Sequence, residues 1–156
     1  MDKEEIIDGL NSLIEINNDR IEGYEKASKE THENDLTTLF ATFIKTSEKC
    51  RLELIDEVSF LGGTPAEGTK ISGKFFRAWM DVKDALTGSD RKTVLDSCEH
   101  GEDAAVTTYD KVINDFGDVS LSTSSPLKSL LMKHRNLIKA DHDRVRSLRD
   151  MEKQRT

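Results

Sequence analysis

The sequence predicts an all-α protein, a four-helix bundle with one long crossover connection. Apolar residues recur at steps of three and four along four long segments, and no segment alternates between apolar and polar residues as a strand does. Charged residues make up 34% and hydrophobic residues 35% of the chain, which holds only 2 prolines and 9 glycines. That balance is typical of a helical protein with solvated outer faces, and the length of 156 residues suits a single domain over residues 1–156.

Two long helices are expected in the first half of the chain, over residues 2–31 and 34–61. Asn34 is the expected N-cap of the second helix. Gly62-Gly63 ends that helix, because glycine adopts a left-handed C-cap conformation without strain. The two apolar stripes consist of Ile6, Leu10, Leu13, Ile21 and Tyr24, and of Leu36, Leu39, Phe40, Phe43, Leu54, Val58 and Leu61.

The second half is expected to hold a short helix over 72–87 and two long helices over 89–116 and 126–151. Proline follows Ser125 at the start of the last helix, an arrangement typical of a helix N-terminus. The connections within each pair of long helices are short and indicate antiparallel neighbours, whereas the second and third long helices are separated by a long connection. The sequence therefore predicts two helical hairpins joined by one crossover.

Charge and targeting signals limit the classes of partner. The chain carries 23 basic and 30 acidic residues, a net charge of −7, so no nucleic-acid partner and no membrane partner are expected. The N-terminus has no basic segment followed by an apolar run, and the expected location is cytoplasmic. Cys50 and Cys98 fall inside helical segments without metal-ligand spacing, and we interpret them as buried thiols.

Each apolar stripe is interrupted near the middle of its helix. Stacked as a bundle, the interrupting side chains form a polar layer at a common depth, where carboxylate-bridged metal proteins of this topology hold their ions. A buried carboxylate must be paired, protonated or metal-bound, and the candidate partners of Glu102 are Lys139, Arg20 and Arg51. The predicted layer consists of Asn17, Ser47, Cys50, Glu102, Lys139 and His142.

Five segments carry a resemblance that covers almost the whole chain. The segments are LNSLIEINNDRIEGYEKA (10–27), ELIDEVSFLGGTP (53–65), FRAWMDVKDALTG (76–88), CEHGEDAAVTTY (98–109) and DHDRVRSLRD (141–150). With them the sequence resembles a bacterial family of ferritin-like four-helix-bundle proteins of unknown function. The resemblance implies a ferritin-like fold and no established activity.

The resemblance also implies where a di-iron centre would take its six ligands. Those places fall on the six residues of the predicted polar layer, and only Glu102 and His142 are of the expected ligand types. A shift of one residue on the second helix offers Glu48 and Arg51 instead. The ligand set is therefore degenerate, and no cofactor is the first expectation. The alternatives are a dinuclear iron centre, and a single iron or other divalent ion held by Glu99, Glu102 and His142.

Two function classes follow from this reading. The first is a non-enzymatic structural or protein-binding module, with a role in stress physiology left open. The alternative is a metal-binding redox or iron-storage protein, which as an enzyme would be a ferritin-like metal-dependent oxidoreductase. Self-association as a dimer or an unknown protein partner is expected. Phe75, Phe76 and Trp79 form an aromatic stripe that either packs on its own bundle or provides the interface.

Overall fold

The computed structural model describes residues 2–68, 91–117 and 126–155, and these residues form four long α-helices. The helices are α1 (Lys3–Glu30), α2 (Asn34–Phe60), α5 (Arg91–Gly117) and α6 (Pro126–Arg155). The described part of the chain contains no strand, so the predicted all-α four-helix fold is confirmed. Among the described helices, none has an apolar stretch long enough to span a bilayer. The expected helix over 72–87, with Phe75, Phe76 and Trp79, lies outside the described residues.

The helix ends follow local capping chemistry. The Asp2 side chain accepts a hydrogen bond of 2.8 Å from the Glu5 backbone N–H at the start of α1. Asn34, expected as a cap, is instead the first residue of α2, and Glu33 precedes it without a side-chain capping bond. At the other end of α2, Gly62 has a φ of +82°, and Gly63 N–H donates to the Val58 carbonyl at 2.9 Å. This Schellman arrangement needs glycine at the left-handed position.

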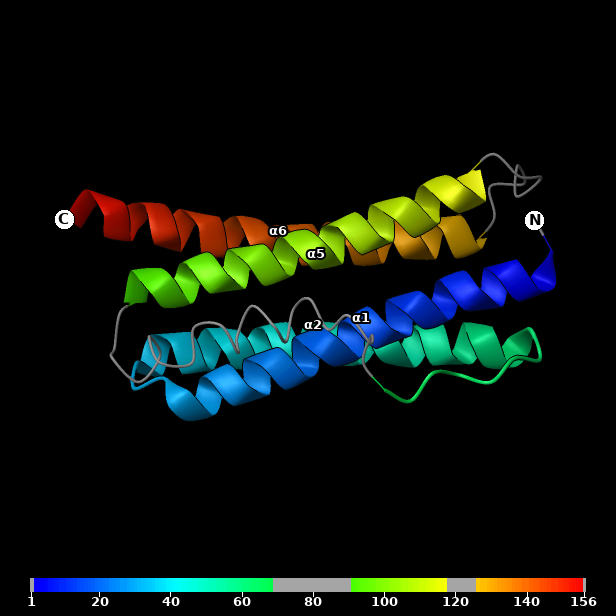
Figure 1. Cartoon of the computed structure of the whole chain (residues 1–156), viewed down its shortest axis with the longest axis horizontal. Helices are drawn as coiled ribbons and strands as arrows, with labels where there is room; N and C mark the ends of the chain where they lie inside the picture. Colours follow the sequence, from blue (N-terminus) through cyan, green and yellow to red (C-terminus); the bar gives the residue numbers. More distant parts are fainter. Residues whose placement is uncertain (1, 69–90, 118–125, 156) are drawn as a thin grey trace.

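The four helices form two antiparallel hairpins, α1 with α2 and α5 with α6 (Figure 1). The second hairpin lies against the first, and α2 and α5 run in the same direction. α2 ends at one end of the bundle, and α5 begins at the other. The start of the connection between them follows α1, where Asn11 bonds the backbone of Thr64 and Ala66, and Asn18 donates to the Gly68 carbonyl.

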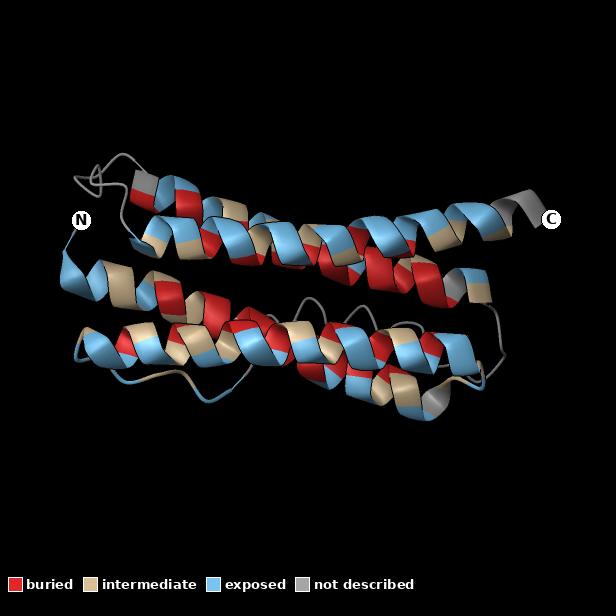
Figure 2. Cartoon of the chain, turned by 180° about the vertical axis from the view of Figure 1, so that it is seen from behind, coloured by how far each residue is buried: buried red, intermediate tan, exposed pale blue. Residues whose placement is uncertain are grey.

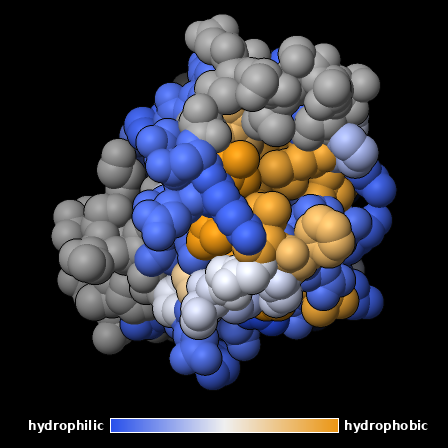
Figure 3. Space-filling model, turned by 90° about the vertical axis from the view of Figure 1, so that its right-hand side faces the viewer, coloured by the Kyte–Doolittle hydropathy of each residue, from blue (hydrophilic) through white to orange (hydrophobic). Residues whose placement is uncertain are grey.

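The apolar core is divided into two clusters along the bundle. The first lies towards the start of α1 and includes Leu13, Leu54, Tyr109 and Leu131, all fully buried. The second lies towards the end of α1 and includes Phe40 among its fully buried residues. Buried residues form stripes where the helices face one another (Figure 2). Apolar side chains also gather at the end of the bundle that holds the N-terminus (Figure 3).

Candidate functional site

Buried polar side chains separate the two apolar clusters. On each helix one of them falls between residues of the first cluster and residues of the second, namely Asn17 on α1, Ser47 on α2, Glu102 on α5 and His142 on α6. Asn17, Ser47, Cys50 and Glu102, four of the six residues of the predicted layer, are fully buried, and His142 is 3% exposed. Arg20 is also fully buried, which is rare for an arginine and requires charged and hydrogen-bonding partners.

Arg20 is the centre of a network that joins all four helices. Its Nε and Nη2 atoms donate to Glu102 Oε1 at 3.1 and 2.7 Å, and Nη2 also donates to Asp141 Oδ2 at 3.0 Å. Its Nη1 atom donates to Ser47 Oγ, and the Tyr24 hydroxyl donates to Glu102 Oε1. We call these five residues, Arg20, Tyr24, Ser47, Glu102 and Asp141, the Arg20 network. Every guanidinium nitrogen has a partner from another helix.

The Arg20 network contains two carboxyl groups and one permanent cation. Burial by itself would lower the pKa of Arg20, but the negative charges around it, Glu102 first, raise that pKa above its usual value. Burial raises the pKa of Asp141 to about 6, and Glu102 adds to this effect while Arg20 opposes it. Burial, with Glu102 beside it, also raises the pKa of the Tyr24 hydroxyl, which therefore stays a hydrogen-bond donor. The charge of Arg20 thus serves mainly to balance Glu102.

A second polar chain leads from the core to the surface. Asn17 Nδ2 donates to the Tyr109 hydroxyl oxygen at 2.9 Å, and that hydroxyl lies 3.2 Å from His134 Nδ1. His134 Nε2 lies 3.0 Å from Glu53 Oε1. Burial lowers the pKa of His134, which favours the neutral ring. In the neutral ring the contacts place the proton on Nε2, which donates to Glu53. Nδ1 then accepts a hydrogen bond from the Tyr109 hydroxyl.

The members of these two networks that the sequence did not single out are the two tyrosines, Glu53, His134 and Asp141. Tyr24 and Tyr109 occupy ordinary positions in apolar stripes, where phenylalanine would give the same sequence pattern. A buried tyrosine hydroxyl nevertheless needs a partner, and this was the available signal that polar groups lie nearby. His134 is fully buried, and its position follows the spacing of the apolar stripe on α6.

The residues at the implied di-iron ligand places do not fit two metal ions. Asn17 is bonded to Tyr109, and Ser47 accepts a hydrogen bond from the Arg20 guanidinium. Burial raises the pKa of Cys50 to about 11, so its thiol remains protonated. Glu102 accepts three hydrogen bonds on Oε1, two of them from the Arg20 guanidinium, while its buried Oε2 has no hydrogen-bond partner. The Arg20 guanidinium bonded at these places repels metal cations. The six places also hold only one carboxylate, Glu102, whereas a dinuclear centre needs several.

Lys139 does not belong to the buried layer. Its side chain is 36% exposed, and its ammonium pairs with Asp143 Oδ1 at 2.8 Å, four residues along the same helix. Arg51, another candidate partner of Glu102, donates instead to Asn18 Oδ1 at 3.0 Å. Arg20 is the candidate that reaches Glu102, because its side chain is fully buried in the core. The lysine side chain instead keeps its ammonium near solvent.

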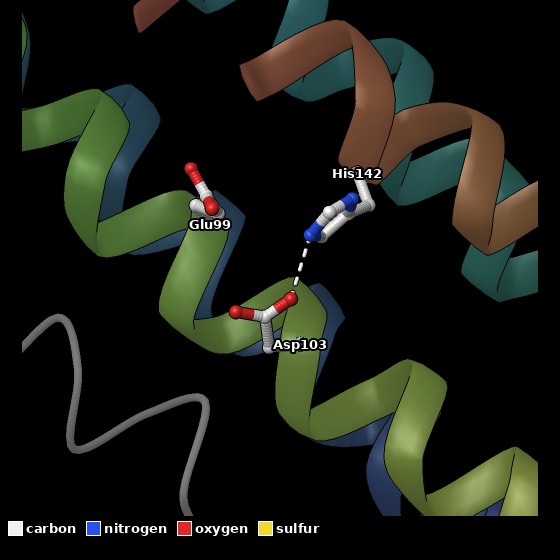
Figure 4. Close-up of side chains that lie close together, drawn as sticks. All are labelled: Glu99, Asp103 and His142. Atoms are coloured by element: carbon white, nitrogen blue, oxygen red, sulfur yellow. Dashed lines mark ion pairs between the residues drawn. The ribbon is translucent and has the colours of Figure 1, made fainter.

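The expected single-ion set needs one correction. Glu99 and His142 do come together, but Asp103 and not Glu102 is the third residue of that cluster (Figure 4). Glu99 and Asp103 are four residues apart and share one face of α5, whereas Glu102 is directed into the core and bonded to Arg20. Glu102 lies three residues after Glu99, and Asp103 lies four residues after it. Either spacing places a side chain on the same side of the helix as Glu99, so the sequence could not distinguish Glu102 from Asp103.

A protein-family model described as a domain of unknown function (DUF2383) matches residues 5–115. The chain belongs to this family. The matched region contains α1 from its third residue, all of α2 and most of α5, and therefore Arg20, Ser47 and Glu102. Asp141 and His142 lie on α6, beyond the match. No curated protein matches the chain significantly.

Proposed function

We propose that this DUF2383 chain is a non-enzymatic, ferritin-like four-helix-bundle module in which a buried arginine takes the central place that metal ions hold in related bundles. One observation carries the proposal, namely the full burial of Arg20 with all of its nitrogens bonded to three other helices. The module acts through its surface, as a structural or protein-binding unit.

The electrostatics of the centre support a structural role. Two divalent ions need several carboxylates, and the Arg20 network supplies only Glu102 and Asp141, which already face a guanidinium. Removing either charge of a buried pair leaves the other charge uncompensated. The Arg20–Glu102 pair therefore holds the helices in one register, and a metal ion does not readily replace Arg20. For this reason a redox or iron-storage role through Glu102 and His142 is the weaker candidate.

Exposed apolar side chains support the protein-binding part of the proposal. On α2, Phe60 is 86% exposed and Leu52 is 62% exposed. Side chains of this size are common at protein interfaces. We expect a cytoplasmic protein that self-associates as a dimer or binds another protein. Light scattering should give the mass of a dimer, and the double variant Leu52→Ser/Phe60→Ser should give that of a monomer if α2 forms the interface.

Iron loading tests the central claim. Protein purified without chelator is incubated with ferrous iron in air, and bound iron and ultraviolet-visible absorbance are measured. We expect no rapid, chain-stoichiometric oxidation, and we expect the same metal content in the wild type and in Glu102→Gln. Two iron ions per chain, lost in Glu102→Gln, would overturn the proposal.

A further inference from the structure

Three side chains with metal-binding atoms meet at the surface of the α5–α6 hairpin. They are Glu99 and Asp103 from α5 and His142 from α6, and one ligand atom of each lies within 4.8 Å of the other two (Figure 4). Glu99 and Asp103 also line a cavity of about 230 Å³. We call these three residues the α5–α6 triad.

The surroundings of His142 give an independent reason to place a cation at the triad. The ring is 3% exposed, and each of its nitrogens faces a carboxylate oxygen. Nδ1 is hydrogen-bonded to Asp143 Oδ1 at 3.1 Å, while Nε2 lies 2.6 Å from Asp103 Oδ1 and makes no hydrogen bond. A neutral imidazole has one N–H, which Asp143 takes. With that tautomer the Nε2 lone pair faces a carboxylate, so the contact needs a positive charge, either a proton on Nε2 or a metal ion that separates the two atoms.

We propose that the α5–α6 triad binds one divalent transition-metal ion of the Zn²⁺ type. Imidazole nitrogen and carboxylate oxygen are ordinary zinc ligands, and three protein ligands leave at least one coordination position for water. Asp143 behind the ring completes the carboxylate–histidine–metal arrangement that fixes the tautomer of a ligating histidine. The site is separate from the Arg20 network.

The geometry needs a rotation of Asp103 to admit an ion. Zinc ligands lie about 2.0–2.2 Å from a tetrahedral metal, so neighbouring ligand atoms are more than about 3 Å apart. The triad atoms are within 4.8 Å of one another, but His142 Nε2 and Asp103 Oδ1, at 2.6 Å, must separate, and the Asp103 side chain is 56% exposed and can rotate.

Nearby arginines order Glu99 without occupying both of its oxygens. Arg149 Nη1 pairs with Glu99 Oε2, whereas Oε1 has Arg146 Nε at 3.6 Å, beyond hydrogen-bond distance. Oε1 is therefore the oxygen available to the ion. Asp96, which also lines the cavity, adds negative charge on the same face of α5 and offsets Arg149.

Isothermal titration of the full chain with zinc chloride tests the proposal. We expect one zinc ion per chain, and we expect Asp103→Asn and His142→Ala each to weaken binding at least about tenfold, as loss of ligating or supporting groups does elsewhere. Asp103 is exposed, so its variant should keep the wild-type circular dichroism even if His142→Ala unfolds. His32→Ala, which removes an exposed histidine from the α1–α2 connection, and Glu102→Gln should bind as the wild type does.

Two results would overturn the proposal. The first is no zinc binding by the wild type, and the second is equal affinity for the wild type and Asp103→Asn, which would indicate adventitious surface binding. Nitrogen NMR of the ring gives a direct readout, because zinc at the triad should shift the Nε2 resonance of His142 and leave that of His32 in place. A His142 ring that carries protons on both nitrogens and does not respond to zinc would also contradict the site.

Discussion

Glu102→Gln removes the negative charge that balances Arg20 and keeps the size of the side chain. Glu102 Oε1 accepts bonds from Arg20 Nε, Arg20 Nη2 and the Tyr24 hydroxyl, and both members of the ion pair are fully buried. Breaking a buried pair costs about 3–5 kcal/mol. Asp141 still faces the guanidinium in the variant, so we expect the lower end, a loss of about 3 kcal/mol in the free energy of unfolding.

The assay is urea denaturation at pH 7, followed by far-ultraviolet circular dichroism, with a thermal scan beside it. For a domain of this length, about 3 kcal/mol corresponds to a fall of roughly 6–12 °C in melting temperature. Asp115→Asn is the matched control, because it removes one carboxylate charge from an exposed pair with Lys111 at 3.5 Å. We expect the control to cost less than about 0.5 kcal/mol. A Glu102→Gln variant within about 1 kcal/mol of the wild type would refute the reasoning.

A double-mutant cycle isolates the pair itself. Arg20→Met removes the cation, and the double variant Arg20→Met/Glu102→Gln removes both charges. Because each single variant leaves an unbalanced buried group, the double variant should be more stable than the sum of the single losses predicts, by about 2 kcal/mol or more. Additive losses would mean that Arg20 and Glu102 contribute independently.

Three further perturbations follow from the geometry. The pKa of Asp141 is raised from 3.8 to about 6, so the folded chain holds this proton more tightly, and the resulting stability is present below pH 4 and lost as the pH rises through 6. The free energy of unfolding from urea denaturation should fall across that window by up to about 3 kcal/mol, and Asp141→Asn should remove this part of the dependence. Tyr109→Phe leaves the buried His134 Nδ1 without its donor and should cost about 1–3 kcal/mol in chemical denaturation; an unchanged midpoint would contradict the bond. Gly9→Ala puts a Cβ 2.8 Å from the Phe116 ring and should destabilise by about 1–3 kcal/mol, with recovery when Phe116→Leu is added.

The sequence determined by itself where the long helices lie and that their middles are polar. Helical periodicity depends only on the order of residues along one chain segment, so it identifies the inward face, the Gly62-Gly63 stop and the interruptions at Asn17 and Glu102. These are local properties, and local signals are enough to predict them.

Only the tertiary structure decided which partners meet. Lys139, Arg20 and Arg51 were equivalent candidates for Glu102, because a helical repeat gives the direction of a side chain and not the neighbour that it reaches. The rotation and spacing of the helices bring Arg20 to Glu102, direct Lys139 to solvent and place Asp103 beside His142. Contacts of this kind join residues about 40 to 120 positions apart, and their energies depend on burial and charge balance that exist only in the assembled bundle.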